Sequence, residues 1–496
     1  MRRFLNKLLS NFRSTNAARS ARRAPRRASL QVEGLEQRTV LSTASLSGST
    51  LLVTADPGTI TIVHGNGTIG IIPEFRQITF KVDASQPKKF DVLDGNTLLG
   101  QFAARLIKNV EVNVQGLDSM IVDDSNVLPF VAGTNISIFG SGQSNSLTLT
   151  GTRTINGGET YTAGEGDQGG SLTLGGSTYE FSNTIGSVID QVKTTAPLVV
   201  KASANFANVT MFNQDSKTQT LTGLANGGAG DFLRYSNKNL VNLELSGTDA
   251  TANLNAAAAA AGEHFFVIDT FSDNQIVHIN ATPSTVDTNV VAAGLDEVFV
   301  TANSGRVFVN GTSSASVIVG SSFGPSSVTS GIKRDVFIEN VGTLYVLDSG
   351  NNTTQENVLV TESTISGIGL FGNNAVVVHY SLTGVLALGT GQLANTYAIA
   401  ASTPGATFAS RIDIGDESAV GLSVVVTLDA ESGLNLNLTN NPFRNSPAPA
   451  SLFISGFGGT FSDPTPNPSS GTEIVTFPGG LDSEVTYSGF SSVNIS

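Results

Sequence analysis

The chain has 496 residues, of which 53 are glycine, none is cysteine or tryptophan, and only 14% are charged. This length exceeds what one compact domain needs, so we expect several domains or one array of repeats. A hydrophobic content of 40% excludes a disordered chain, and the lack of cysteine excludes disulfides and thiolate metal sites.

Charge divides the chain into a short basic leader and a long acidic body. Residues 1–40 hold ten Arg or Lys and two Glu, a net charge of +8, whereas the remainder holds 17 basic and 38 acidic residues, a net charge of −21. So acidic a body argues against nucleic-acid binding. No apolar run approaches the roughly 20 residues of a membrane-spanning helix, so we predict no membrane span.

The leader begins with a basic amphipathic pattern over residues 2–13. Its apolar positions fall on one helical stripe and are Phe4, Leu5, Leu8, Leu9 and Phe12. This pattern favours a targeting segment. The apolar region of about 7 to 15 residues that a secretory signal needs does not follow it, and the Arg-rich stretch at 14–27 also fits an organelle transit peptide.

A short motif closes the leader at residues 35–42, which read LEQRTVLS. It resembles the LEPR-XLL motif of large, repetitive exported proteins of planctomycete-type bacteria. The matching positions are Leu35, Glu36, Arg38, Leu41 and Ser42. The chain departs from the motif at Gln37, where the family has proline, and at Val40, where it has leucine. The resemblance covers residues 1–45 closely and implies export to the cell surface or beyond, without implying a reaction.

From about residue 50 onward, short apolar runs rich in Val, Ile and Thr alternate with Gly, Asn, Asp and Ser. Examples are TITIVHGNGTIGII at 59–72 and EVFVTANSGRVFVNG at 297–311. Such runs predict short strands joined by tight turns. The six alanines at 256–261 are an exception, and they fit either a short helix or the filling of a crowded turn.

The spacing of these runs indicates a repeat of about 20 residues, a period typical of stacked coils. EVFV at 297 is followed 38 positions later by DVFI at 335, GNN at 350 recurs 22 positions later, and apolar triplets at 358 and 376 lie 18 apart. Two or three strands per repeat, with Gly or Asn at corners that accept a positive φ, predict one coil of a right-handed parallel β-solenoid. Stacked Asn side chains should hydrogen-bond between coils.

We therefore predict an all-β, elongated solenoid with an irregular N-terminal cap. The predicted parts are a leader at 1–45, a cap at 46–110, the solenoid at 111–440, and a Pro-rich turn with a C-terminal β segment at 441–496. The alternative is a series of β-sandwich domains of about 100 residues each, which also reads as short strands and turns.

A search for reactive groups predicts no catalytic, cofactor-binding or metal-ligating residues. His64, His264, His278 and His379 are isolated, and no HExxH motif is present. Calcium is the one cofactor left open, because acidic turns supply oxygen ligands. We interpret the three candidate turns as solvated, and they are Asp123–Asp124, Glu165–Asp167 and Gly227–Asp231.

The function predicted from these features is that of an exported structural or adhesive protein of the bacterial envelope or matrix, with no catalysis. Its expected partners are cell-surface or matrix components, through polysaccharide binding or self-association. The alternative is a polysaccharide-binding or polysaccharide-degrading β-helix protein, for which Asp123–Asp124 and Lys333–Asp335 are the candidate charged clusters. An aromatic content of 7% argues against a sugar-stacking platform.

Overall fold

The computed structural model divides the chain into two units, residues 1–39 and 40–496. The residues that the structure describes all belong to the second unit. They are 42–55, 59–63, 69–73, 76–115, 118–141, 145–164, 169–182, 185–202, 207–224, 232–272, 274–322, 326–351, 356–368, 370–371, 375–391, 393, 395–400, 409–416, 422–428, 435–440, 450–456, 459–463, 466–467, 469–478, 480 and 482–496. The predicted amphipathic helix of the leader therefore lies outside the described residues.

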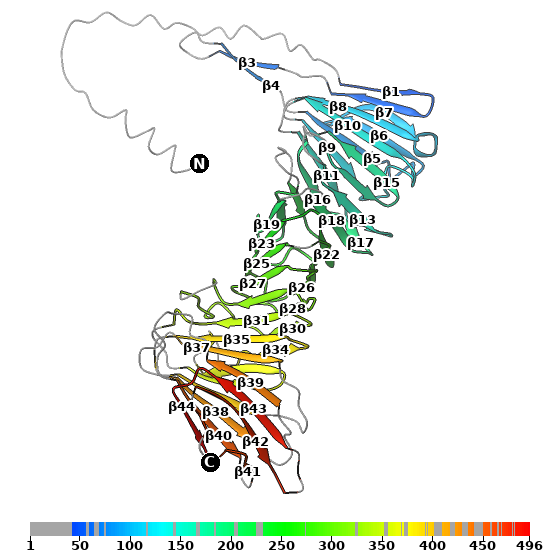
Figure 1. Cartoon of the computed structure of the whole chain (residues 1–496). Helices are drawn as coiled ribbons and strands as arrows, with labels where there is room; N and C mark the ends of the chain where they lie inside the picture. The colour runs from blue at the N-terminus through cyan, green and yellow to red at the C-terminus, as the bar shows by residue number, and fades with distance from the viewer. Residues whose placement is uncertain are drawn as a thin grey trace, which may run out of the picture. The chain divides into compact units, whose positions relative to one another are not determined.

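The described chain is all-β and is dominated by two sheets of 20 strands each (Figure 1). The strands of sheet 1, in their order across the sheet, are β1 (Thr43–Ser47), β2 (Thr50–Thr54), β8 (Asn109–Gln115), β10 (Asn135–Ser141), β15 (Ser177–Phe181), β14 (Ser171–Leu174), β13 (Glu159–Thr162), β18 (Leu198–Ala202), β22 (Leu240–Leu245), β24 (Phe265–Thr270), β26 (Asp287–Val291), β28 (Val307–Asn310), β30 (Val336–Glu339), β34 (Val378–Ser381), β33 (Thr364–Ile368), β32 (Asn357–Val360), β36 (Asn395–Ala400), β38 (Leu422–Leu428), β40 (Ala450–Gly456) and β44 (Ser492–Ile495).

The strands of sheet 2, again in their order across the sheet, are β7 (Thr97–Ala103), β6 (Lys89–Asp94), β5 (Gln77–Val82), β9 (Ser119–Asp123), β11 (Asn145–Thr150), β16 (Ile185–Asp190), β21 (Leu233–Tyr235), β20 (Gln219–Thr222), β19 (Asn208–Asn213), β23 (Thr251–Asn255), β25 (Ile276–Ala281), β27 (Glu297–Val300), β29 (Ser316–Val319), β31 (Thr343–Leu347), β35 (Val385–Thr390), β37 (Arg411–Asp416), β39 (Asn435–Asn440), β43 (Ser483–Ser488), β42 (Ser470–Thr476) and β41 (Thr460–Phe461). Two small sheets join β3 (Thr59–Val63) to β4 (Ile69–Pro73) and β12 (Thr154–Ile155) to β17 (Lys193–Thr194).

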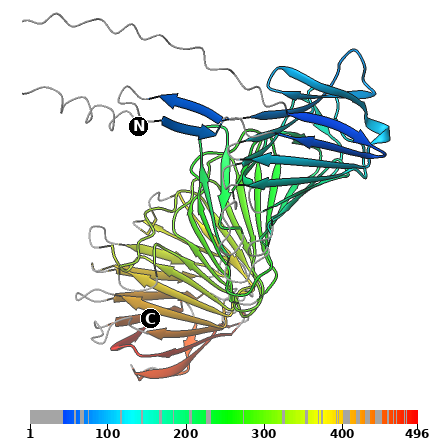
Figure 2. The ribbon, with the colours of Figure 1, turned by 90° about the horizontal axis from the view of Figure 1, so that it is seen from above.

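The chain alternates between the two sheets, and this makes the arrangement solenoid-like (Figures 1 and 2). From β22 to β31 each strand in sheet 1 is followed by one in sheet 2, and strands of successive coils pair in parallel. Each coil thus contributes two principal strands. The alternation continues beyond the predicted boundary at residue 440, because β38 and β40 pair in parallel on either side of it.

The coil length varies along the chain. Near the middle, Ile276 pairs with Glu297 and Glu297 pairs with Ser316. The lengths of these two coils are therefore close to the predicted repeat length. In sheet 1, however, Val307 pairs with Val336, which makes that coil distinctly longer.

Two of the spacings that suggested the repeat have another origin. EVFV at 297–300 forms β27 of sheet 2, whereas Val336–Glu339 forms β30 of sheet 1, so the two segments are not equivalent turns of the coil. The apolar triplets near 358 and 376 lie in or beside β32 and β34, which pair with opposite edges of β33. These register assignments were wrong because an apolar triplet does not reveal which sheet it joins.

Antiparallel strand triplets interrupt the parallel stacking at three places and occupy both ends of sheet 2. The internal triplets are β13–β15, β19–β21 and β32–β34, and in each the chain runs back toward the preceding coil before it continues. The end triplets are β5–β7 and β41–β43. Each triplet lengthens its coil, so that the parallel partner of Val336 in the following coil is Val378, beyond β32 and β33.

The core lies between the two sheets and follows from the alternation of side chains along each strand. In β22, for example, Val241, Leu243 and Leu245 have no exposed surface, while the residues between them are half-buried. Burial of each such side chain contributes about 1.5 to 3 kcal/mol before the entropy of ordering is subtracted. The alanine run at 256–261 is not helical but fills a turn, with Ala256 and Ala260 buried.

The predicted corner chemistry is confirmed. Asn237, Asn274 and Asn340 have positive φ angles of 62°, 66° and 57°, as do many glycines. Stacked Asn side chains also bond between coils, since Asn253 Nδ2 donates to Asn208 Oδ1 at 2.9 Å. Among the described residues, no helix combines the length and the apolar character needed to cross a membrane.

Candidate functional site

The outward face of sheet 1 carries a groove with a volume of about 720 Å³, which we call the aromatic groove. It crosses strands β24, β26, β28, β30 and β34, so it runs along the stack of coils. The lining residues that carry its chemistry are Phe265, Asp287, Asn289, Asn310, Phe308, Phe337, Glu339, His379 and Ser381. Aromatic rings and hydrogen-bonding side chains therefore share one surface.

Register explains why the rings of this groove stack. Phe308, Phe337 and His379 occupy matching positions on three successive strands of sheet 1. The centroids of Phe308 and Phe337 are 4.8 Å apart, and those of Phe337 and His379 are 4.5 Å apart, with interplanar angles of 12° and 4°. These separations match the spacing of hydrogen-bonded strands, about 4.8 Å, so parallel in-register pairing itself produces the stack.

A charged pair closes one end of the ring stack. The Arg306 guanidinium donates to Asp287 through Nε at 3.0 Å and through Nη2 at 2.5 Å, and its Cζ lies 5.5 Å from the centroid of Phe308. Arg306 thereby couples an ion pair to a cation–π contact. A second hollow of about 450 Å³ adjoins the groove at Phe265 and Asp287, and it is also lined by His264 and Arg334.

The exposed parts of the groove determine what it can bind. Phe265 is 45% exposed, while the rings of Phe308 and Phe337 are half-buried because they cover each other's faces. The surface available to a ligand consists of the edges of these two rings, the Phe265 ring and the side chains of Asn289 and Glu339. An apolar aromatic strip flanked by amide and carboxylate groups suits a ligand that has both C–H faces and hydroxyl groups.

Asp123 and Asp124, one of the predicted acidic turns, have different environments. Asp123 Oδ1 accepts a hydrogen bond from the Ser125 backbone at 2.9 Å, as in an ordinary turn. Asp124 is only 1% exposed, and neither of its carboxylate oxygens accepts a hydrogen bond. Burial, together with the neighbouring charge of Asp123, raises the pKa of Asp124 to about 6. A cavity of about 240 Å³ beside Asp124 is also lined by Arg153.

The other predicted charged cluster, Lys333–Asp335, lies beside the aromatic groove rather than near Asp124. The backbone N–H of Lys333 donates to Asn303 Oδ1 at 3.0 Å, and Asp335 Oδ2 lies 3.9 Å from His379 Nε2. Lys333–Asp335 directly precede β30 of sheet 1, far along the chain from the Asp123 turn. In the described ranges, no three His, Cys, Asp or Glu side chains come together as a metal site.

Several predicted residues fall outside the described residues. They are the turns Glu165–Asp167 and Gly227–Asp231, His64, and Leu35, Glu36, Arg38 and Leu41 of the motif. Ser42, the last motif residue, is described and is 4% exposed. Its hydroxyl donates to Asp94 Oδ2 at 2.7 Å, so the end of the motif is attached to strand β6.

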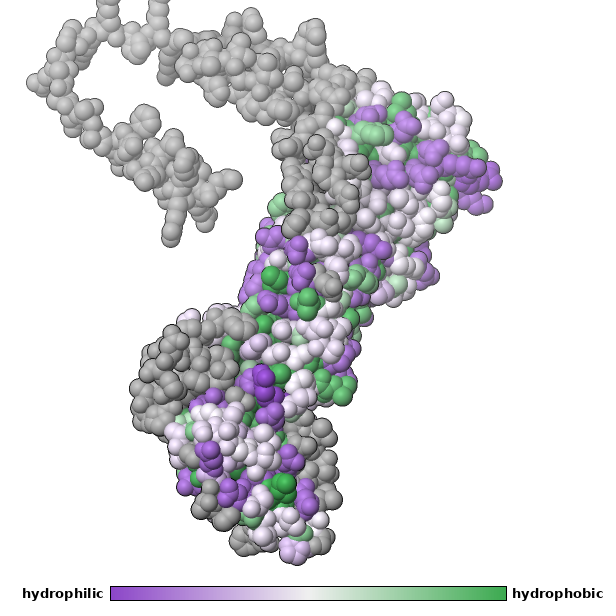
Figure 3. Space-filling view, viewed as in Figure 1, coloured by the Kyte–Doolittle hydropathy of each residue, from purple (hydrophilic) through white to green (hydrophobic). Residues whose placement is uncertain are grey.

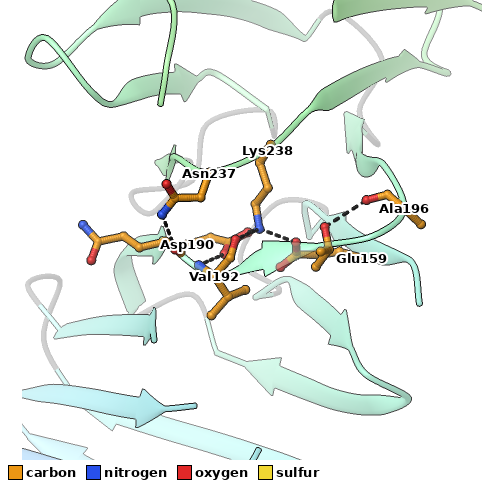
Figure 4. Close-up of polar contacts among 8 residues, drawn as sticks. Glu159, Asp190, Val192, Ala196, Asn237 and Lys238 are labelled. Atoms are coloured by element: carbon orange, nitrogen blue, oxygen red, sulfur yellow. Dashed lines mark hydrogen bonds and ion pairs between the residues drawn. The ribbon is translucent and has the colours of Figure 1, made fainter. Parts of the chain in front are cut away.

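A buried ion cluster, missed in the sequence, joins three segments at a corner between the sheets (Figure 4). Lys238 Nζ lies 2.5 Å from Glu159 Oε2 and 2.7 Å from Asp190 Oδ2, and it donates to the Val192 carbonyl at 2.8 Å. All three charged side chains have 0% exposure. Burial and the charge of Asp190 raise the pKa of Glu159 well above its usual range. Burial lowers the pKa of Lys238, but its two carboxylate partners outweigh burial and raise it overall. The cluster stabilises the corner and offers no accessible reactive group.

A second buried pair of carboxyl groups lies after β31. Asn351 Nδ2 donates to Asp348 Oδ2 and to Glu356 Oε1, both at 3.0 Å, and Glu356 is fully buried. Burial, followed by the charge of Asp348, raises the pKa of Glu356 to about 10. At neutral pH Glu356 is therefore protonated, and a neutral acid beside a carboxylate serves as a structural hydrogen-bond donor.

Comparison with known proteins gives no match to a family model, to a curated protein or to a solved structure.

Proposed function

We propose that the chain is an exported, non-catalytic protein of a bacterial envelope or extracellular matrix, folded as a right-handed β-solenoid. Its role is structural and adhesive, and it contacts a polysaccharide through the aromatic groove. The observation that carries this proposal is the stacked Phe308, Phe337 and His379 column beside an exposed Phe265, with Asn289 and Glu339 on the same surface.

The chemistry of the groove supports a saccharide ligand. The C–H faces of a sugar ring pack on aromatic surface, while its hydroxyl groups exchange hydrogen bonds with amide and carboxylate side chains. Because coils repeat along the sheet, equivalent backbone positions recur at about 4.8 Å, which suits an extended polymer better than a compact small molecule. Asp287 is already paired with Arg306, which makes it a poor general base and favours passive binding.

Export is supported by the basic leader and by the LEPR-XLL-like motif that ends at Ser42. The expected result is that the full chain, produced in a planctomycete-type host, is labelled by antibody on intact cells. A variant with Arg38→Ala and Leu41→Ala should remain inside the cells at equal abundance. Intracellular retention of the unaltered chain would contradict the proposed location.

Groove binding is tested with the full chain on a panel of insoluble and immobilised polysaccharides. Phe265→Ala and Phe308→Ala should each weaken binding about tenfold, which corresponds to about 1.4 kcal/mol of lost contact. Phe299→Ala is the matched control, because Phe299 stacks on His278 at the same 4.8 Å separation on sheet 2. Equal losses in all three variants would show that the groove is not the binding surface.

A further inference from the structure

Within the described residues, the outermost strands at both ends of the stack of coils are each paired along one edge only. At the N-terminal end, β1 pairs with β2 and β7 pairs with β6, and neither has a second partner strand among the described residues. At the other end, β44 pairs with β40 alone and β41 with β42 alone within the same described ranges. Each open edge exposes backbone N–H and C=O groups that a further strand can bind.

Two of the four edge strands, β1 and β44, lack the features that usually block such pairing, whereas β7 contains a bulge opposite Val92 and Leu93 and β41 has only two residues. Natural edge strands carry charged residues, proline or bulges that prevent another strand from adding. The sequences of β1 (TASLS), β7 (TLLGQFA) and β44 (SVNI) contain neither charged residues nor proline. Leu46 on β1 is 39% exposed and Leu98 on β7 is 56% exposed, so the N-terminal edges also present apolar side chains.

Exposed charged side chains at the two ends differ in sign. Residues 42–115 hold six basic and six acidic residues, of which Asp56 and Glu74 lie outside the described residues, whereas residues 450–496 hold four acidic residues and no basic one. Lys88 and Arg105 are exposed beside β7, since Arg105 follows that strand and the Lys88 carbonyl accepts a hydrogen bond from Ala104. Asp463 and Asp482 are exposed at the β41 end. Figure 3 shows hydrophilic residues gathered over the β6 and β7 end.

From these observations we infer that copies of this chain associate head to tail, with the C-terminal end of one stack pairing with the N-terminal end of the next. In sheet 1, β44 of one copy adds to β1 of the next copy. The pairing is antiparallel, because β1 runs opposite to β2 and to the parallel strands that follow it. In sheet 2, β41 of the first copy meets β7 of the second.

The backbone of β44 fits this role. The N–H of Ser496 donates to Ile454 of β40 at 3.0 Å, and its carbonyl accepts from Gly456 at 2.9 Å. Because alternate residues of a strand direct their backbone groups to opposite sides, the N–H groups of Val493 and Ile495 face the open edge. Such an interface is heterologous, so repeated addition gives a linear assembly rather than a closed dimer.

The test measures association of the full chain by sedimentation velocity over a range of protein concentrations, with negative-stain electron microscopy of the products. The unaltered chain should form linear oligomers that shorten as salt rises from about 0.1 M to about 1 M, where the Debye length falls from about 10 Å to about 3 Å. One variant reverses the charge of two side chains at the N-terminal end (Lys88→Glu with Arg105→Glu). Another variant reverses the charge of two side chains at the C-terminal end (Asp463→Lys with Asp482→Lys). Each should weaken association at least about tenfold, because like charges then face each other across the junction.

A third variant that combines both reversals restores opposite charge and should associate to within about threefold of the unaltered chain. The basic leader is unchanged in all variants, so this rescue assigns the contact to the ends of the folded stack. Phe265→Ala serves as a control that alters the groove and should assemble normally, which separates this inference from the proposed ligand binding. The inference would be overturned if the chain stayed monomeric at every concentration or if its oligomers formed equally well in the charge-reversed variants. It would also be overturned if the combined variant did not recover association.

Discussion

Replacing Lys238 by methionine tests whether the buried ion cluster holds the corner between β13, β16 and β22 together. The substitution preserves most of the side-chain volume but removes the charge that faces Glu159 and Asp190. It also removes the lysine donor from the Val192 carbonyl and from Asp190 Oδ2. Removal of one partner from a buried ion pair costs about 3 to 5 kcal/mol, because the remaining charge stays desolvated. We expect a loss of that size.

The matched control is Glu159→Gln. Burial and Asp190 raise the pKa of Glu159 well above its usual range, which disfavours its charged form, and a glutamine amide keeps its shape and an oxygen that accepts from Lys238. This change should alter stability by less than about 1 kcal/mol. Both variants leave the core residues around the corner unchanged.

Hydrogen–deuterium exchange is the suitable assay, because a stack of coils need not unfold in one step. In the Lys238→Met variant, amide protection in β13, β16 and β22 should fall by about two to four powers of ten, which is the expected loss at 1.36 kcal/mol per power of ten. Protection in β36 and β38 should not change. A loss below tenfold at the corner, or an equal loss in the Glu159→Gln variant, would refute the conclusion that the charge of Lys238 beside Asp190 stabilises the corner.

Three further predictions concern buried carboxyl groups. The pKa of Asp124 is raised from 3.8 to about 6, so the stability of the fold falls by up to about 3 kcal/mol as pH rises through this interval. Asp124→Asn should remove that loss and raise the melting temperature at pH 7.5. Gly151→Ala should destabilise the fold, since a Cβ there would lie 1.0 Å from Asp124 Oδ1, and the double variant with Asp124→Ala should recover part of the loss in a thermal melt. Glu356 has its pKa raised from 4.5 to about 10, so stability falls across that interval; Glu356→Gln should flatten the decline in a denaturant titration repeated from pH 5 to pH 9.

The general character of the fold could be predicted from local patterns. Alternating apolar runs with Gly and Asn at corners indicated short stacked strands, and the Asn253–Asn208 bond bears out the expected stacking of amides. The register could not be predicted, because the coil that joins Glu297 to Ser316 is much shorter than the one that joins Val307 to Val336, and antiparallel triplets lengthen others. The sequence of an apolar segment such as 358–360 is equally compatible with a strand of a parallel coil and with a strand of an antiparallel triplet.

The candidate site was hidden for the same reason. Phe308, Phe337 and His379 lie far apart in the sequence at unequal intervals, and only their register brings the three rings into one stack. The low aromatic content of the whole chain therefore did not indicate that aromatic side chains gather in one groove. The ion cluster was equally out of reach, since Glu159 and Lys238 lie 79 residues apart in segments with no shared pattern. Asp124 was singled out as part of an acidic turn, but its burial depends on the fold around it.

The most direct test of the account is to incubate the full chain with the polysaccharide that it binds best and to measure both retention and released products. The account predicts saturable retention that Phe265→Ala weakens and Phe299→Ala does not, with no reducing ends or unsaturated sugars released over the background of a heat-denatured sample. Release of such products, with loss of activity in variants of the groove carboxylates Asp287 or Glu339, would contradict a passive adhesive role and identify an enzyme instead.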